Sequence, residues 1–279
     1  MTAYVAVYDD SERDPQLPAS RIVVDIHRRL GIPATFCIVT KPLEDDHALA
    51  RAYRDLLSNP ADDGLIRVIP HSHTHAMLLD HKTLGKGIEP EKRDYEIRRS
   101  KVLVEDIFGR EAAGFRSPNG FYQGWQGHPD LLGIVNDCEF RFLSSDLMGP
   151  GDTVPAPLTQ PYFHEKDGFP DLLEVPGHDW HDNVLSGWPP VPAAWPPCVP
   201  AGMPNQPPRT PEEKFAVYRP NMEWCVENRA AFYSPALHPW SIRKFDPSGS
   251  WVEMMLRHTL AIGMTPMSMP DFAERFRSL

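Results

Sequence analysis

Three histidines on alternate residues form the first group of side chains that could carry chemistry. His71, His73 and His75 lie in the segment HSHTH, directly after the apolar run Leu65–Pro70. In an extended chain all three imidazoles would lie on one side, whereas a helical turn would align only the first and the third. Two histidines with one carboxylate leave coordination positions open for water, as a catalytic metal site requires. The segment therefore predicts metal binding; the alternative is a histidine-rich loop that only hydrogen-bonds its neighbours.

Asp9 and Asp10 are the first candidates for the acidic groups of such a site. They follow Ala3–Tyr8, a β-rich apolar run that is typical of a buried strand. Adjacent acids often only cap a helix or lie in a turn. After a buried strand, however, one carboxylate can bind a cation while its neighbour stays free as a general base. The pair is therefore a candidate for two separate roles.

Further candidates stand where other strands are expected to end. They are Arg116, the pair Asp179 and Trp180, and His238. In parallel α/β architectures, sites are assembled at the carboxyl ends of the strands. Each residue has a plainer alternative: Arg116 could form a surface ion pair of little energetic value, and His238 could be a core or turn histidine. Their common placement favours one shared site.

The segments that must position these residues alternate between strand and helix patterns. Strands are expected at Ala3–Tyr8, Ala34–Val39, Leu65–Ile69, Ala112–Phe115, Phe140–Ser144, Leu172–Val175 and Phe232–Leu237. Helices are expected at Ser20–Leu30, His47–Leu57, Glu91–Phe108, Pro211–Arg229, Trp251–Ala261 and Pro270–Phe276. This alternation predicts an α/β fold with a parallel sheet, open or closed into a barrel. We expect a single domain over residues 1–279, with 149–169 and 186–211 as loop insertions.

A proline-rich segment interrupts the pattern. Residues 188–211, WPPVPAAWPPCVPAGMPNQPPRTP, contain 10 prolines in 24 residues. Proline lacks the N–H donor that helices and central strands need, so neither structure is expected here. A semi-rigid surface loop and a lid or subunit contact are both open interpretations, because Trp188 and Trp195 are side chains that favour burial.

Composition and charge exclude several classes of function. The net charge of −10 disfavours nucleic acid and anionic membrane surfaces as partners. No apolar run approaches the roughly 18 residues of a membrane span, and the acidic start MTAYVAVYDD is unlike a signal peptide. The four cysteines are scattered, without a C-x-x-C pair. These features predict a cytoplasmic protein with reduced thiols.

Five segments together resemble the motifs of a known family. The stretches VAVYDD, HSHTH, FRSPNG, HDW and ALHP, in this order, are similar to those of the NodB-like polysaccharide deacetylases, carbohydrate esterase family four. The resemblance extends from about residue 3 to the C-terminus. It implies a distorted (β/α) barrel with fewer than eight full units, here with a proline-rich insertion. It also implies a hydrolase in carbohydrate metabolism.

The resemblance implies one divalent metal ion held by Asp10, His71 and His75. Zinc is the simplest choice, and cobalt, nickel and manganese stay open. Such an ion polarises an amide carbonyl and acidifies bound water. His73 is no ligand in the family, so we expect it to pack or to support its neighbours.

The other roles implied by the resemblance concern proton transfer and substrate contact. Asp9 would be the catalytic base, paired with Arg116, since a nearby cation lowers the pKa of a carboxylate. His238 would be the general acid, with Asp179 orienting it; the nearby His178, His181 and Asp182 leave the choice of that partner open. Substrate contacts would come from three residues: Trp180 as one wall of the groove, Tyr8 and Pro118.

Departures from the family pattern bear on the substrate. Ser11 stands where the family has glycine, and Pro239 where an acid is common. Without an export signal, and with insertions that could close a groove, the sequence favours a small soluble substrate over a polymer. We expect a metal-dependent hydrolase that removes an acyl group, most simply acetyl, from an amino sugar or similar amine. A ring-opening hydrolase of cyclic imides or ureides and a non-catalytic carbohydrate-binding relative are the alternatives, and homo-oligomerisation stays open.

Overall fold

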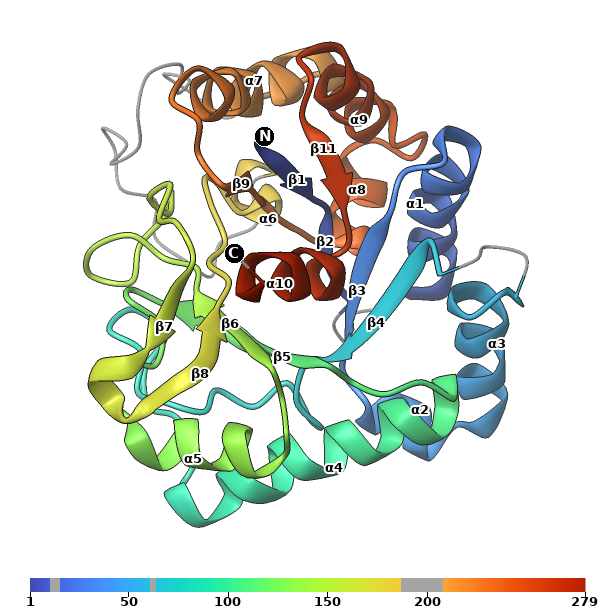
Figure 1. Ribbon diagram of the computed structural model, residues 1–279. Helices are drawn as coiled ribbons and strands as arrows, with labels where there is room; N and C mark the ends of the chain where they lie inside the picture. Colours follow the sequence, from blue (N-terminus) through green and yellow to red (C-terminus); the bar gives the residue numbers. More distant parts are fainter. Residues whose placement is uncertain (11–15, 61–63, 187–207, 279) are drawn as a thin grey trace.

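The strands of the protein form three neighbouring sheets around a common interior. The computed structural model describes residues 1–10, 16–60, 64–186 and 208–278 (Figure 1). The sheets have the orders β11-β1-β9, β10-β2-β3-β4 and β5-β6-β8-β7. The strands are β1 Ala3–Val5, β2 Val7–Asp10, β3 Ala34–Ile38, β4 Ile66–Pro70, β5 Gly114–Phe121, β6 Phe142–Asp146, β7 Tyr162–His164, β8 Phe169–Glu174, β9 Phe232–Tyr233, β10 Ala236–Leu237 and β11 Thr265–Met267.

Pairing within the sheets is parallel except between β7 and β8. A single parallel bridge between His178 and Pro235 joins the chain after β8 to the segment between β9 and β10. The expected α/β class is confirmed, and the strands form an incompletely closed parallel barrel. Parallel strands bring their carboxyl ends to one edge, so β2, β4, β5 and β10 deliver the residues that follow them to the same side.

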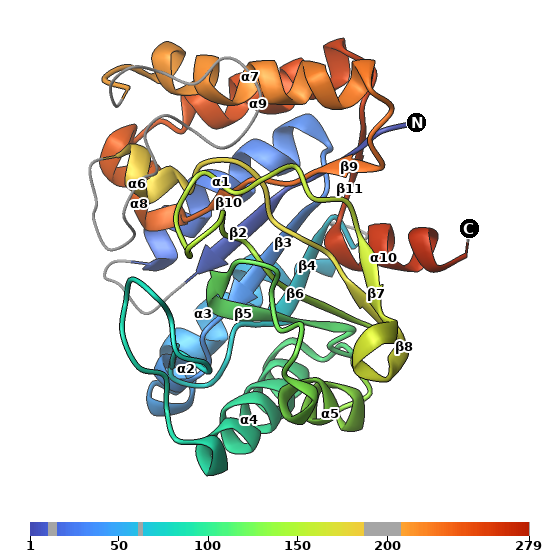
Figure 2. The same cartoon turned by 90° about the vertical axis from the view of Figure 1, so that its left-hand side faces the viewer.

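Helices cover the outside of the strands (Figures 1 and 2). They are α1 Gln16–Leu30, α2 Lys41–Asp45, α3 His47–Leu57, α4 Pro90–Phe108, α5 Pro129–Asp137, α6 Asp182–Leu185, α7 Pro211–Glu227, α8 Pro239–Phe245, α9 Ser250–Ala261 and α10 Met269–Arg277. α10 lies across the end of the strands where they begin (Figures 1 and 2). Its Met269 and Phe272 pack with inward side chains of β1 and β2, so this end of the interior is closed by apolar contacts.

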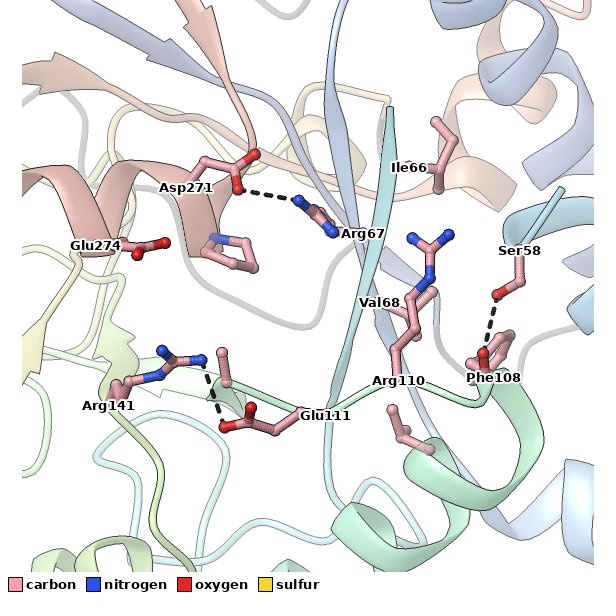
Figure 3. A pocket seen from close by; sticks show the side chains of 13 residues that line it. Ser58, Ile66, Arg67, Val68, Phe108, Arg110, Glu111, Arg141, Asp271 and Glu274 are labelled. Atoms are coloured by element: carbon pink, nitrogen blue, oxygen red, sulfur yellow. Dashed lines mark hydrogen bonds and ion pairs between the residues drawn. The ribbon is translucent and has the colours of Figure 1, made fainter. Parts of the chain in front are cut away.

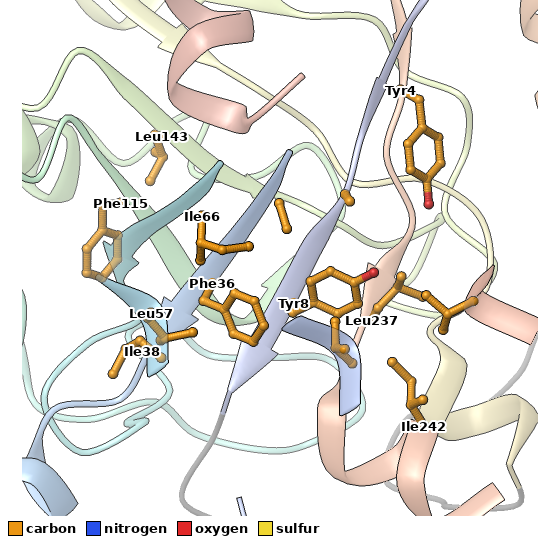
Figure 4. Packing of buried hydrophobic residues seen from close by; sticks show 14 of the residues in the cluster. Tyr4, Tyr8, Phe36, Ile38, Leu57, Ile66, Phe115, Leu143, Leu237 and Ile242 are labelled. Atoms are coloured by element: carbon orange, nitrogen blue, oxygen red, sulfur yellow. The ribbon is translucent and has the colours of Figure 1, made fainter. Parts of the chain in front are cut away.

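The alternation of side chains along each strand divides the core into two parts. In the first strands, Val5 and Val7 belong to an inner cluster together with Ile69 of β4. Tyr8 and Phe36 belong instead to the larger cluster between strands and helices (Figure 4). Successive residues of a strand point to opposite faces. This parity decides which of two adjacent functional residues can reach the interior.

Most of the expected elements are present, and the differences are local. The expected strand Phe232–Leu237 is split into β9 and β10 around Ser234 and Pro235, because proline cannot donate to the ladder. Seven short elements were not expected from the sequence: α2, α5, α6, α8, β7, β11 and a turn of 3-10 helix at Glu165–Asp167. Most of the proline-rich segment lies outside the described residues. Among the described helices, none is both long and apolar enough to cross a bilayer.

Candidate active site

A layer of polar side chains lies above the inner apolar cluster at the carboxyl ends of the strands. Asp9 shares the inward parity of Val7, and His71 continues that of Ile69, one strand-period later. Arg116 of β5 and Ser144 of β6 are paired in register and reach into the same space. All four are buried. The interior is therefore apolar over most of its length and polar only at this edge.

Asp9 and Arg116 form a buried ion pair. The guanidinium donates through Nε to Asp9 Oδ1 at 3.0 Å and through Nη2 to Oδ2 at 2.8 Å. It also donates to Ser144 Oγ at 2.9 Å. Burial raises the pKa of Asp9, but Arg116, with smaller help from His71 and His238, lowers it well below its usual range. Asp9 is therefore ionised and held in one orientation, and the expected pairing with Arg116 is confirmed.

His71 is oriented by the backbone of the neighbouring strand. Its Nδ1 lies 3.0 Å from the carbonyl oxygen of Arg116. A carbonyl can only accept, so Nδ1 carries the proton and Nε2 holds the lone pair. Burial lowers the pKa of His71 to about 4, which keeps the ring neutral. The ring of His75 lies edge-on to it, with 4.9 Å between centroids.

Asp10 points to the other side of the sheet. Its Oδ2 accepts a 2.5 Å hydrogen bond from Ser20 Oγ on α1, in the layer between strands and helices. Its Oδ1 is buried and has no hydrogen-bond partner within the described chain. Burial without a cation raises the pKa of Asp10 to about 7. The two adjacent aspartates thus occupy very different surroundings.

The predicted metal ligands are brought together only in part. The structure pairs His71 with His75, and the unpartnered Oδ1 of Asp10 and the Nε2 of His71 are donors that a metal ion could use. As placed, however, the described residues contain no group of three or more His, Cys, Asp or Glu side chains that could hold a metal ion. The arrangement does not fit a complete site, so no chemical step is derived through a metal. The set Asp10, His71 and His75 stays a prediction.

His238 follows β10 and is oriented by Asp182. The imidazole Nδ1 lies 2.7 Å from Asp182 Oδ1, and the carboxylate is fully buried. Nδ1 therefore donates to the carboxylate and Nε2 is the nitrogen left to act on a substrate. His238 and Asp9 are close enough for each charge to affect the other. His238 and Asp9 thus lie near each other at this edge.

The expectation that Asp179 orients His238 is wrong. Asp179 has a left-handed backbone, with φ of 67°, and its carboxylate accepts from three neutral donors instead. These are the backbone N–H of Trp180, Asn221 Nδ2 at 2.8 Å and the hydroxyl of Tyr233 at 2.7 Å. Burial raises its pKa to about 6. Asp179 ties α7 to β9, while Asp182, three residues later, performs the expected role.

Two of the predicted substrate contacts are also corrected. Trp180 is fully buried in the core, so it does not form an accessible wall. Tyr8 is fully buried too, stacks near Phe36 and hydrogen-bonds His27 Nε2 at 2.8 Å. It has the parity of Asp10, which directs it to the helices (Figure 4). Pro118 is buried within β5, and its role as a substrate contact stays a prediction.

His73 behaves as the sequence indicated. Its Nδ1 lies 3.0 Å from Thr40 Oγ1, and its Nε2 lies 3.3 Å from Glu44 of α2. It therefore packs against the outer layer. Ser144 is a site residue that the sequence did not single out, and Asp182 was named only as a neighbour of Asp179. Asp182 lies in the segment HDWHD, where the sequence shows a carboxylate but does not show which residue it contacts.

A pocket of about 340 Å³ lies at the opposite end of the strands (Figure 3). Arg67 pairs there with Asp271 at 3.2 Å, and Arg141 with Glu111 at 3.4 Å. The pocket lies between the start of β4, the end of α4 and α10, and it contains none of the predicted site residues. In parallel barrels this end contributes to stability, whereas chemistry takes place at the carboxyl ends.

Comparison with known proteins gives one match in sequence and many in fold. Residues 5–127 match the model of a family described as polysaccharide deacetylase. No curated protein sequence matches the chain. A protein from Mycobacterium smegmatis, assigned as a polysaccharide deacetylase, superposes with a TM-score of 0.68 at 17% identity, over 99% of this chain and 90% of that one.

Two further solved structures share the fold. Puue allantoinase superposes with a TM-score of 0.62 at 10% identity, over 93% of this chain and 72% of its own. The family 4 carbohydrate esterase from Streptomyces lividans, in complex with acetate, gives 0.52 at 14% identity, over 96% and 94%. At such identities the likeness concerns the fold.

Proposed function

Since the sequence match and the fold together support a NodB-like polysaccharide deacetylase, we propose that the protein hydrolyses amide bonds in a small N-acylated amine. The acyl group is most simply acetyl, and the amine an amino sugar or a related compound. The observation that carries this proposal is the pair of fixed proton-handling groups. Asp9 is held ionised by Arg116, and His238 is held by Asp182, around one site.

The geometry supports a division of labour between these groups. The Asp9 carboxylate takes a proton from the attacking water as its oxygen bonds to the carbonyl carbon. His238 donates a proton to the amine nitrogen as the carbon–nitrogen bond breaks. The products are a carboxylic acid and a free amine. Arg116 keeps Asp9 in its basic form, and Asp182 stabilises the imidazolium and fixes its tautomer, as in other acid–base pairs with a buried aspartate.

We also propose that the reaction uses a divalent metal ion, zinc in the first place. Support comes from the family match, from the pairing of His71 with His75 and from the unpartnered Oδ1 of Asp10. When bound, such an ion would polarise the substrate carbonyl and acidify water. A saccharide or other small molecule is the expected partner.

The test combines metal analysis with a substrate panel. Purified protein is assayed for bound metals by mass spectrometry and for turnover of N-acetyl amino sugars and other N-acyl amines. We expect turnover with release of acetate, lost with a chelator and restored by zinc. Asp9→Asn should keep the metal and lose turnover, whereas His71→Ala should lose both. Full metal content in His71→Ala would refute the ligand assignment, and failure to hydrolyse any amide would refute the function.

Ring opening of a cyclic imide or ureide is the second candidate. The whole-chain fold likeness to an allantoinase favours it, and the same base and acid would serve, because the bond broken is again an amide. The products decide between the two. Deacetylation gives two molecules and free acetate, whereas ring opening gives one product and no acetate.

A further inference from the structure

A lysine with no role so far lies behind the pair formed by His238 and Asp182. Lys214, in the first turns of α7, is fully buried. Its Nζ donates to the backbone carbonyl of Asp182 at 3.0 Å and to Ser186 Oγ at 2.6 Å. The same nitrogen lies 4.0 Å from Asp182 Oδ2. Among the described residues, its hydrogen bonds are therefore to α6 and to the residue that follows it.

The surroundings of this lysine make its burial costly. Its Nζ lies 4.3 Å from the ring centroid of Phe245 and 4.6 Å from that of Trp251. Ring faces attract a cation, but an isolated buried ammonium still loses its hydration. Burial lowers the pKa of Lys214 to about 8, with Asp182 and Asp246 acting in the opposite direction, so it is mainly protonated at neutral pH.

The contacts of Asp182 indicate why a buried lysine lies beside it. Its Oδ1 is used by His238, while its Oδ2 is buried and has no hydrogen-bond partner within the described chain. A positive charge nearby stabilises a buried carboxylate oxygen that has no hydrogen-bond partner. Lys214 supplies this charge, and its bond to the Asp182 carbonyl fixes the backbone from which the carboxylate extends. The carboxylate is thereby held toward His238.

We propose that Lys214 is a positioning residue of the active site, which holds the carboxylate of Asp182 aimed at Nδ1 of His238. Asp9, Asp10, His71 and His181 also lie near His238, but they come from other elements and do not contact Asp182 through any described hydrogen bond. The kinetic part of this proposal rests on the proposed function; the structural part does not.

The first experiment observes the imidazole directly and needs no substrate. Protein labelled with ¹⁵N-histidine is compared as wild type, Lys214→Met and Arg219→Met by NMR at neutral pH. Arg219 is on the same helix but half exposed, in a weak pair with Glu223, so its variant is the matched control. We expect the hydrogen-bonded Nδ1–H signal of His238, assigned from His238→Gln, to disappear or broaden only in Lys214→Met. An unchanged signal in a folded Lys214→Met protein would overturn the proposal.

A second variant keeps the test decisive if Lys214→Met does not fold. Lys214→Gln retains a donor for the Asp182 carbonyl and removes only the charge. We expect it to fold and to show the same weakened Nδ1–H signal. A wild-type signal in this variant would show that the charge plays no part, and would overturn the proposal.

The kinetic experiment separates positioning from general stability. We expect Lys214→Met to lower kcat at least tenfold with KM changed less than twofold, while Arg219→Met matches wild type. The double variant Lys214→Met/Asp182→Asn should be no slower than Asp182→Asn alone, because both changes remove one interaction. If the kcat of the double variant falls by the product of the two single-variant factors, the proposal is overturned. If wild-type protein hydrolyses no amide, the proposed function fails, and the NMR comparison still decides the role of Lys214.

Discussion

Two regions of the molecule each contain two buried aspartates close together in sequence, and in each region only one of them faces a charged partner. At the end of β2, Asp9 meets Arg116, whereas Asp10 meets the hydroxyl of Ser20. Around α6, Asp182 meets His238 and Lys214, whereas Asp179 meets only neutral donors. The type of residue is the same throughout, so its neighbours alone make the difference.

The difference separates proton chemistry from support. Burial raises the pKa of Asp10 to about 7 and that of Asp179 to about 6, because neither has a cation beside it. Asp9, with Arg116, stays ionised. A carboxylate that must act as a base or hold an imidazolium has to be charged, and only the two with partners are placed for this. The following changes test that contrast.

Asp9→Asn should have the largest effect. It removes the base but keeps the shape of the side chain, so we expect kcat to fall by roughly 10²–10⁴-fold, the usual contribution of a general base. The measurement is steady-state hydrolysis of the best substrate from the panel, with the folded fraction checked by circular dichroism. A variant that keeps more than a tenth of wild-type kcat would remove Asp9 from the mechanism.

Arg116→Met should have the next largest effect, on stability. It leaves Asp9 buried without its counter-charge, and breaking a buried pair in this way typically costs about 3–5 kcal/mol of unfolding free energy. Urea denaturation measures the loss. The double variant Asp9→Asn/Arg116→Met should regain part of this stability but no activity. If the single variant loses less than about 1 kcal/mol, the pair is not the buried interaction described above.

Asp182→Asn should mainly lower kcat, whereas Asp179→Asn should mainly lower the free energy of unfolding. For Asp182→Asn we expect kcat to fall roughly 100-fold with a modest change in stability, because a neutral amide no longer stabilises the imidazolium of His238. For Asp179→Asn we expect a loss of about 1–3 kcal/mol, since its three donors lose an acceptor, with kcat of the folded protein nearly unchanged. Measurements of kcat and of the urea midpoint for both variants test this difference. A large loss of kcat in Asp179→Asn, with little loss in Asp182→Asn, would show that Asp179 is the partner of His238.

The pH dependence of stability should reveal Lys214 with the smallest of these effects. Its pKa in the folded protein is lowered to about 8, whereas in the unfolded chain it has the ordinary value of about 10.4. Between these values the unfolded state binds more protons, so wild-type stability rises with pH. Lys214→Met should lack this rise, and the variant should lose about 2 kcal/mol relative to wild type between pH 7 and pH 10. Parallel curves in urea titrations at the two pH values would contradict the assigned burial.

The repeating pattern of the chain determined a large part of this protein. Alternation of strand and helix patterns predicted the α/β class, and the five motifs predicted the family. Strand parity is also local information: Asp9 shares a face with Val7, and Asp10 shares one with Tyr8. The pairing of Asp9 with Arg116 was implied by the family resemblance, and both residues were expected at strand ends on one edge. Helices and strands of strong periodicity were found close to their expected positions.

Only the tertiary structure decided which partner each of these groups meets. In the segment HDWHD either aspartate could serve His238, and the left-handed backbone at Asp179 turns that carboxylate away from it. Trp180 looked like a groove wall and is core. Lys214 reaches Asp182 from 32 residues further along the chain. Periodicity encodes the face on which a side chain lies, but the contacts of a buried charge depend on how distant segments pack, and this information is not local.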